Sequence, residues 1–411
     1  MMTGVSRQGK RSPKFNGVSK RNRISAMKKP SRRIIPTLVR LAVLASVLGI
    51  TASCGNSSAT VGKLPVPNKS ASVKLSPEAK ALLAVGGGDT SKDYFEATSS
   101  GLVAAAAGDD DSGFYDLGKL LVKDGLGNTI IDLGREMNAG WYEWSEQRAP
   151  SSEPDAYILA WRHIVTTMRT VPGQHFKFLW TLYPDETSVA DSWPGSGYVD
   201  YVGTDIFDWY GGPGSTYPHT ASGALDHEKK WQEILTTAVG GLDWMAKFSK
   251  ATGKQIIIPE WGLDFHTFGG QDDLLFIRNM MAWMKAHDAI GLYWGGDHLS
   301  EVSAPSGPLI ANQGESAQNN TVGEVNALGG LLGGRLQYAG VYLPDSLKLS
   351  DSTDQPVLAP WENTGYQIIL SVPIDPLPPT IKSYSGPPEP GDKPYQLADY
   401  PDAVAAIKQG L

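Results

Sequence analysis

The sequence predicts an α/β fold, specifically a (β/α)8 TIM barrel, from three observations. Helix-like and strand-like segments alternate from about residue 113 onward, and such alternation favours a parallel sheet with helices outside it. Eight apolar strand candidates follow one another, within the length of about 250 residues that such a barrel needs. The 411 residues, 41% hydrophobic and 19% charged, exclude a fibrous or wholly disordered chain.

The first four barrel segments follow from hydrophobic spacing. Leucines at helical spacing predict a helix over 115–124, and the apolar run 128–133 predicts a short strand. Residues 152–154, Ser-Glu-Pro, have the pattern of a helix start, and apolar side chains line one face of the segment that follows. A further strand is expected over 176–182.

The remaining segments complete the count of eight strands. Strands are expected over 198–207, 255–259 and 290–294, and helices over 227–250, weakened at Gly240 and Gly241, and over 272–287. The last three strand candidates are separated by turns rich in Pro, Asp, Ser and Gly, and they cover 337–343, 356–361 and 366–372.

Charge is distributed unevenly along the chain. Of the 36 basic residues, 12 lie in the first 40 positions, which hold no acidic residue, so the rest carries 24 basic against 43 acidic residues. An acidic body argues against nucleic acid or anionic lipid as its ligand, because both need a positive footprint.

The basic N-terminus has the pattern of an export signal. The basic residues up to Arg40 precede the uncharged apolar run 41–50 and then the small residues 51–53. The run is too short for a permanent membrane span. We expect a signal peptide with a basic N-terminal extension over 1–53, with Met1 and Met27 both open as the start of translation.

Cys54, the only cysteine, excludes an internal disulfide and a cysteine-based metal site. Its place directly after the small residues resembles the lipobox of bacterial lipoproteins, with Thr51 in place of the usual Leu. We expect lipidation of Cys54, a flexible tether over 54–76 and the barrel over 77–411. The protein is then anchored on the extracellular side of the cell membrane; simple cleavage and secretion is the alternative.

Two glutamates follow hydrophobic strands and are candidates for catalysis. The sequence Ile130-Ile131-Asp132-Leu133-Gly134-Arg135-Glu136 ends one strand, and Ile256-Ile257-Ile258-Pro259-Glu260 ends another. Residues at the carboxyl ends of barrel strands face the active site. Glycoside hydrolysis needs such a carboxyl pair, one to protonate the leaving oxygen and one to attack the anomeric carbon or activate water.

Several of the 12 tryptophans lie at or just past predicted strand ends, where an indole face can stack on a sugar ring. These are Trp141, Trp144, Trp209, Trp261 and Trp294; those inside predicted helices, Trp161, Trp231, Trp244 and Trp283, are expected in the core.

The motifs resemble glycoside hydrolase family 26, the β-mannanase-type enzymes of the glutamate-pair barrel clan. The similar segments are Asp132 to Trp141, Val199-Asp200-Tyr201-Val202-Gly203-Thr204-Asp205-Ile206-Phe207, and Glu260-Trp261-Gly262. The resemblance implies Glu136 as acid/base and Glu260 as nucleophile of a retaining reaction. It implies that Asn138, Asp205 and Trp294 shape the subsite around the cleaved bond. The full set of expected substrate-binding residues is Arg135, Asn138, Trp141, Trp144, Asp205, Phe207, Trp209, Trp261, His266 and Trp294.

The chain departs from the family pattern at three positions. Asp132 replaces the usual Arg, Arg135 replaces the His or Trp before the acid, and Phe207 replaces a Tyr that would touch the nucleophile; Tyr210 is a candidate substitute. These changes put mannan specificity in doubt. They leave open a catalytically weak or dead barrel that acts as a glycan-binding lipoprotein, and a scaffold protein without a sugar ligand.

The order of the strands predicts a circular permutation. In the family the acid/base ends the fourth strand, yet the residues before Glu136 hold no three β/α units. We expect family strands 4–8 first and strands 1–3 at the C-terminus, from the candidates 337–343, 357–361 and 368–373. A closed barrel tolerates this because its termini lie near each other. The alternative is a truncated barrel with an unrelated C-terminal domain.

Other kinds of site find no support in the sequence. The seven histidines lack metal-ligand spacing, and no nucleophile elbow, phosphate loop or dinucleotide fingerprint occurs. We therefore expect no cofactor and no metal. The expected partners are a polysaccharide or oligosaccharide substrate and the membrane through the lipid anchor only, with no nucleic acid, and the protein is expected to be a monomer.

Overall fold

The computed structural model describes residues 75–86, 99–185, 188–209, 216–263, 269–293, 322–344, 356–375 and 400–411. The chain divides into two units, Met1–Ser58 and Ala59–Leu411, and every described residue belongs to the second. The predicted export signal, Cys54 and all but the last two residues of the predicted tether lie outside the described residues. No helix within the described ranges has the length and apolarity that a membrane crossing requires.

The described elements alternate between strands and helices along most of the chain. The strands are β1 (Ile130–Leu133), β2 (Lys177–Leu182), β3 (Tyr201–Thr204), β4 (Ile206–Asp208), β5 (Gln255–Leu263), β6 (Ile290–Tyr293), β7 (Tyr338–Tyr342) and β8 (Gln367–Val372). The helices are α1 (Pro77–Leu83), α2 (Ser100–Ala106), α3 (Asp111–Lys123), α4 (Ala156–Arg169), α5 (His227–Thr236), α6 (Leu242–Thr252), α7 (Leu274–Ala286), α8 (Val322–Leu332) and α9 (Pro401–Gly410).

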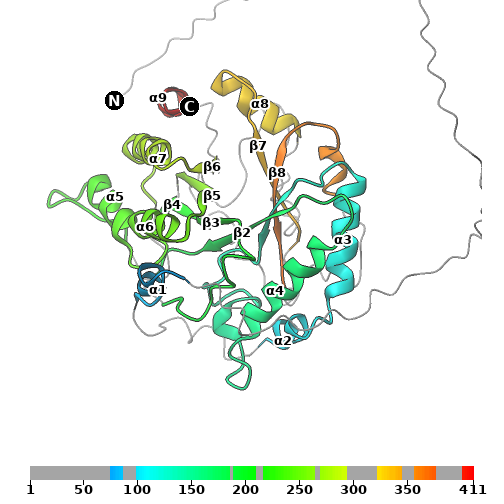
Figure 1. Cartoon of the computed structure of the whole chain (residues 1–411). Coiled ribbons are helices and arrows are strands. Elements are labelled where there is room, and N and C mark those ends of the chain that lie inside the picture. Colours follow the sequence, from blue (N-terminus) through cyan, green and yellow to red (C-terminus); the bar gives the residue numbers. More distant parts are fainter. Residues whose placement is uncertain are drawn as a thin grey trace, which may run out of the picture. The chain divides into compact units, whose positions relative to one another are not determined.

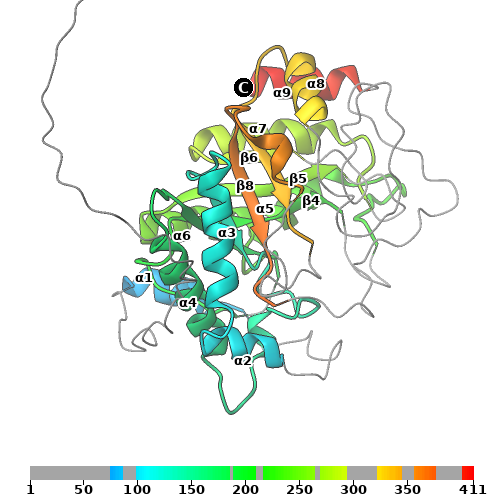
Figure 2. The same cartoon turned by 90° about the vertical axis from the view of Figure 1, so that its right-hand side faces the viewer.

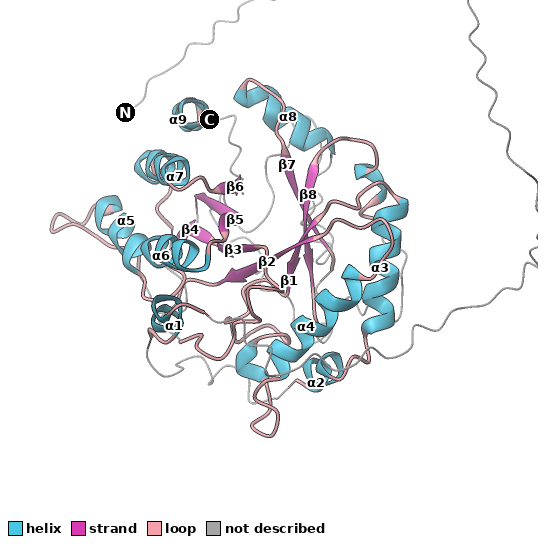
Figure 3. Ribbon diagram, in the orientation of Figure 1, coloured by secondary structure: helices cyan, strands magenta, loops and turns pink. Residues whose placement is uncertain are grey.

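All strand pairs in the sheet are parallel, and the strands follow one another around a curled sheet in the order β7, β8, β1, β2, β3, β5, β6. β3 and β4 are two parts of one strand, interrupted at Asp205, and both pair with β5. Helices surround the strands (Figures 1 and 3). The expected α/β barrel is confirmed.

The two ends of the curled sheet, β6 and β7, approach each other without a ladder between them in the described residues. A Cβ added to Gly340 of β7 would lie 3.2 Å from a methyl group of Leu292 in β6. On the outside, α9 contacts both α7 and α8 (Figures 1 and 2). The C-terminal helix therefore lies where the sheet comes closest to closing on itself.

Three segments differ from the sequence-based expectation. The expected strand over 356–361 is wrong: it contains the 3-10 turn Ala359–Trp361, where Pro360 has no N–H for a ladder. The expected helix over 227–250 is two helices, because Gly240 has a positive φ of 73°, which interrupts the helical conformation between α5 and α6. β5 continues past Pro259 to Leu263, so Glu260 lies within the strand.

The barrel interior changes from apolar to polar along the strands. Ile130, Leu179, Ile257 and Ile369, each from a different strand, form one small buried cluster inside the sheet. Two residues further along their strands, on the same face, lie Asp132, Thr181 and Ser371. Strand side chains of the opposite face, such as Ile131 and Phe178, belong to the large core between sheet and helices. The polar side chains therefore gather at the carboxyl ends.

The predicted permutation is not decided by the pairing of the strands. β1, which precedes Glu136, is the first described strand of the chain. It pairs with β8, the last described strand. A closed barrel pairs its first strand with its last whichever strand comes first. The permutation therefore stays a prediction, and its proposed second strand at 357–361 is not present as a strand.

Candidate active site

The turn after β1 carries Glu136 in a constrained backbone conformation. Gly134 has φ 55° and Glu136 has φ 49°, and Glu136 is one of few non-glycine residues of the described chain with positive φ. A Cβ on Gly134 would lie 2.8 Å from Ile374, so only glycine fits the close approach there. A left-handed non-glycine residue costs about 1–2 kcal/mol, and such strain is often found at functional sites.

Hydrogen bonds hold this turn in place. The Asn138 side chain donates to the Tyr183 carbonyl and accepts from the Tyr183 N–H, both at 2.8 Å. The Asn138 carbonyl accepts from Gln147 at 2.7 Å, and the indole of Trp144 donates to the Arg135 carbonyl at 2.8 Å. Asn138 thus ties the end of β1 to the end of β2, and its amide is used for that contact.

Glu260 reaches the same region from the middle of β5. The register between β5 and β6 shifts between Ile258 and Trp261, which is a local irregularity of the strand. Glu260 is 15% exposed in its side chain and lies 4.0 Å from Arg135, measured from Oε1 to Nε. Trp261 lies on the opposite face, 2% exposed and packed edge-on against Tyr293, so it is part of the core.

Asp132, inside the barrel, accepts a hydrogen bond from the Thr181 hydroxyl at 2.7 Å and is 2% exposed. Burial raises its pKa from 3.8 to about 7, and the Glu260 charge adds to that rise; the Thr181 hydrogen bond and Arg135 oppose it. The carboxyl is therefore mostly protonated below neutral pH.

Glu136 also has a raised pKa, about 8 instead of 4.5. Burial is the largest cause and the charge of Glu260 is the second, while Arg135 and a hydrogen bond from Tyr142 oppose the rise. The two glutamates are thus close enough for the charge of one to hold the proton on the other. One protonated and one ionised carboxyl is what a general acid and a nucleophile need.

Asp205 is a third buried carboxyl, at the break between β3 and β4. It is 3% exposed, and neither of its oxygens has a hydrogen-bond partner within the described chain. Its pKa is raised by burial first and then by the charges of Glu260, Glu136 and Asp132. Burial and the neighbouring negative charges therefore favour the protonated form of Asp205.

The raised pKa of Asp132 predicts a pH-dependent stability. Between pH 4 and 7 the folded state keeps a proton on Asp132 that the unfolded state releases, so stability from this group is full at low pH and is lost as pH rises toward 7. Each full proton difference changes the free energy of unfolding by about 1.4 kcal/mol per pH unit.

We therefore expect Asp132→Asn to lose less stability than the wild type between pH 5 and 7, by about 1 kcal/mol per pH unit. Urea unfolding at pH 5, 6 and 7 measures this. The control is Asp116→Asn on the surface of α3, which keeps the wild-type slope. Equal slopes for wild type and Asp132→Asn would mean that Asp132 is ionised in the folded protein at pH 5.

The other predicted substrate-binding residues fall into distinct positions. Trp141 is 39% exposed and meets Tyr183 edge-on at 5.0 Å, so its indole is accessible. Trp144 is fully buried and stacks on Tyr142 at 4.4 Å, so its ring faces no solvent. Phe207 in β4 and Trp209 just after it are half-buried. The remaining candidates, His266, Trp294 and the substitute hydroxyl Tyr210, lie outside the described residues.

Three tyrosines near the glutamates were missed by sequence reasoning. Tyr142 hydrogen-bonds Glu136. Tyr183 is half-buried with a raised pKa, to which the charge of Glu136 contributes, and Tyr342 of β7 is buried with a raised pKa, to which Glu260 contributes. Tyr342 could have been predicted from the alternation of side chains along β7, since Tyr338, Gly340 and Tyr342 share one face of the strand.

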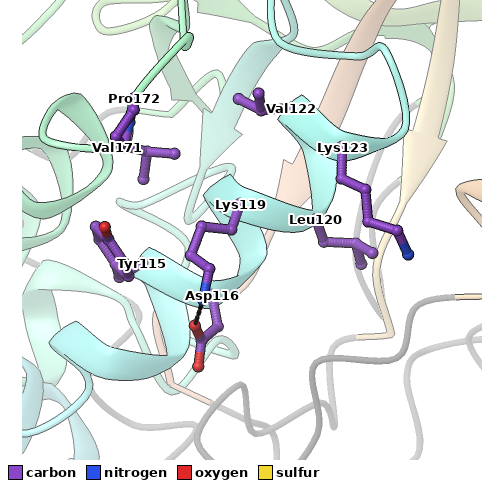
Figure 4. Close-up of a pocket in the computed structure, with 8 residues that line it drawn as sticks. All are labelled: Tyr115, Asp116, Lys119, Leu120, Val122, Lys123, Val171 and Pro172. Atoms are coloured by element: carbon purple, nitrogen blue, oxygen red, sulfur yellow. Dashed lines mark hydrogen bonds and ion pairs between the residues drawn. The ribbon is translucent and has the colours of Figure 1, made fainter. Parts of the chain in front are cut away.

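The described residues include no group of three or more His, Cys, Asp or Glu side chains arranged to hold a metal ion. A hollow on the outer surface is a separate feature, formed by α3 and the turn after α4 (Figure 4). Tyr115, Lys119 and Val171 are among its lining residues, and Lys119 pairs with Asp116 at 3.0 Å. It involves none of the strand-end carboxyls.

Comparison with known proteins points to one family. The family model described as "Glycosyl hydrolase family 26" matches residues 129–225. This segment contains Glu136, Asn138 and Asp205 but ends before Glu260. A curated relative is Endoglucanase H of Acetivibrio thermocellus, 33% identical over 81 residues, which are 18% of this chain and 9% of the relative. The chain thus spans less than a tenth of that relative's length.

Solved structures with partial similarity include two mannanases. A GH26 beta-mannanase from Bacteroides ovatus is 14% identical, with 41% of this chain and 42% of that chain covered and a TM-score of 0.30. The Bacillus subtilis mannanase man26 is 20% identical, with 46% of each chain covered and a TM-score of 0.30. In both cases the chain spans less than half of the solved protein.

Proposed function

Residues 129–225 belong to glycosyl hydrolase family 26, and from this premise we propose that the protein is a retaining glycoside hydrolase of β-glycan backbones. The observation that carries the proposal is the charge interaction of Glu136, just after β1, with Glu260, in the carboxyl-terminal half of β5. The substrate class also follows the printed names of the relatives, an endoglucanase and mannanases.

In the proposed reaction Glu260 is the nucleophile and Glu136 the acid/base. The ionised Glu260 attacks the anomeric carbon while Glu136 gives its proton to the departing glycosidic oxygen, so one C–O bond forms as another breaks. Glu136, now ionised, then takes a proton from water, which attacks the same carbon and releases Glu260. This route retains the anomeric configuration and needs carboxyl groups about 5–5.5 Å apart.

The surroundings support the protonated state that Glu136 needs at neutral pH. Burial and the neighbouring Glu260 charge give it a pKa of about 8, despite the opposing charge of Arg135. Nearby, the exposed indole of Trp141 offers an apolar face to a sugar ring, and the buried carboxyl of Asp205 has two oxygens without a hydrogen-bond partner in the described chain. These features fit a neutral polyhydroxylated ligand.

Release of new reducing ends from a panel of β-mannan, β-glucan, xylan and bacterial envelope polysaccharides tests the proposal. We expect cleavage of at least one backbone by the wild type and none by Glu260→Ala. Pull-down of the same polysaccharides is measured in parallel. A panel without cleavage by the wild type but with binding would contradict the enzyme and indicate the glycan-binding barrel instead.

We also propose that the protein is exported and anchored through a lipid on Cys54. The support is the order of basic residues, apolar run and small residues that precede Cys54 in the sequence. In an expressing bacterium, the full chain is expected in the membrane fraction and Cys54→Ser in the soluble exported fraction. The same fractionation of both proteins would exclude the lipid anchor, and retention of both in the cytoplasm would exclude the signal.

A further inference from the structure

Arg135 occupies the centre of the carboxyl cluster. Its guanidinium Nε lies 4.0 Å from Glu260 Oε1, and its Nη1 donates to the Ser371 hydroxyl at 3.2 Å. Its charge also acts on Asp132, Glu136 and Asp205, opposing the rise of each pKa. In the described part of the chain, it is the one cation that contributes to all three carboxyls.

Aromatic rings enclose the same guanidinium. Its carbon lies 5.1 Å from the ring centroid of Tyr142 and 5.5 Å from that of Tyr342. Trp144 lies at 6.0 Å, and the indole of Trp144 also fixes the Arg135 backbone carbonyl. The Arg135 side chain is 8% exposed. Because rings, a hydroxyl and a carboxylate already surround it, little of the guanidinium is accessible to a substrate.

The residues that hold Arg135 come from separate parts of the barrel. Tyr142 and Trp144 belong to the loop after β1, Glu260 to β5, Tyr342 to β7 and Ser371 to β8. A planar guanidinium held by several elements has few alternative positions. Because its Nε lies 4.0 Å from Glu260 Oε1, it places a positive charge of constrained position beside the Glu260 carboxylate.

We propose that Arg135 is a positioning residue, which holds the ionised Glu260 in its attacking place and balances the charge of the carboxyl cluster, and is not a ligand of the substrate. The inference rests on the proposed retaining reaction and changes the role expected for Arg135 from the sequence. In this role the Arg135 charge keeps Glu260 ionised and limits how far the pKa of Glu136 rises.

Removal of the charge tests the first part of the proposal. Arg135 opposes the rise of the Glu136 pKa, so Arg135→Gln is expected to move the titration midpoint of Glu136 upward by about one pH unit. Carbon-13 NMR of glutamate-labelled protein measures this midpoint without any substrate, with Glu136→Gln to assign the signal. The alkaline limb of the pH–rate profile is expected to move in the same direction.

Two further variants distinguish the effect of the Arg135 charge from the effect of removing a buried arginine or changing its shape. Arg148→Gln removes another buried arginine, which pairs with Glu143 at 2.9 Å, and is expected to leave the Glu136 midpoint unchanged. Arg135→Lys keeps the charge but not the planar fork, so the midpoint is expected to stay while kcat falls about tenfold or more at constant KM.

The outcomes distinguish this inference from the proposed function. An unchanged Glu136 midpoint in Arg135→Gln overturns the charge role. A raised KM with unchanged kcat in Arg135→Lys overturns the positioning role and makes Arg135 a substrate ligand. If Arg135→Gln does not fold, the kcat and KM of Arg135→Lys decide. If the wild type cleaves no glycan, the proposed function fails, and the NMR titration still tests the charge role by itself.

Discussion

Glu260→Ala is expected to lose at least about 10⁴-fold of kcat/KM on the cleaved polysaccharide, which is the largest effect of any single change. Its carboxylate forms the covalent bond to the sugar in the proposed reaction, and it lies 4.0 Å from the Arg135 guanidinium, whose charge favours the ionised form. Initial rates of reducing-end release measure the loss. Glu260→Gln, which keeps the shape and removes the charge, is expected to lose as much.

Azide provides the control for this variant. The small anion fits the space that Glu260→Ala leaves and attacks from the same face, so restored cleavage is expected to give a glycosyl azide of inverted configuration. Glu228→Ala, an exposed glutamate of α5, is expected to keep the wild-type rate. Full activity of Glu260→Ala would exclude Glu260 as the nucleophile.

Glu136→Ala is expected to lose about 10²–10⁴-fold of activity on the polysaccharide, the usual contribution of a general acid. The loss depends on the leaving group, because a sugar leaves poorly without a proton whereas a nitrophenolate leaves without one. An activated aryl glycoside of the same sugar is therefore expected to form the glycosyl-enzyme at a rate closer to that of the wild type. Its steady-state and burst kinetics measure the two steps separately.

Rescue and a matched variant complete this test. Azide is expected to speed the second step in Glu136→Ala and to give a product of retained configuration, since it takes the place of the activated water. Glu153→Ala, an exposed glutamate of the loop after β1, is the control with wild-type rates. An equal loss on activated and natural substrates would exclude Glu136 as the acid.

The sequence alone predicted the two strands that position the glutamates, although β5 runs past Glu260 to Leu263. Each follows a run of isoleucines, and such runs are typical of buried parallel strands. Parallel strands bring their carboxyl-terminal ends to the same side of a barrel. The strand pattern of the sequence therefore predicted both the barrel and a pair of neighbouring glutamates. The family resemblance is confirmed for residues 129–225.

The sequence could not predict the contacts that depend on closure of the barrel. Tyr342 and Ser371 lie more than 200 residues after Arg135, and nothing local connects them to it. Trp144 and Trp261 were expected at or past strand ends and accessible to a sugar, but both are buried, and Trp261 lies within β5. For Trp261 a strict period of two from the inward Ile257 would place the indole inside the barrel, but the irregularity of β5 between Ile258 and Trp261 reverses the alternation.

The extra polar groups of the site follow from the departures from the family pattern. Asp132 takes the place of an arginine, and Arg135 supplies a guanidinium three residues later, at the other side of the turn. The structure joins the two through electrostatics, as Arg135 opposes the raised pKa of Asp132. The exchange therefore keeps one positive charge in the cluster and adds one carboxyl that holds a proton.

The configuration of the first product tests the central claim, a retaining glutamate pair, most directly. Proton NMR of a soluble β-linked oligosaccharide, recorded within seconds to minutes of adding the wild-type enzyme, shows which anomer appears before mutarotation. The account predicts the β-anomer first, from two displacements at Glu260 and Glu136. Initial release of the α-anomer would contradict it and would mean a single displacement by water.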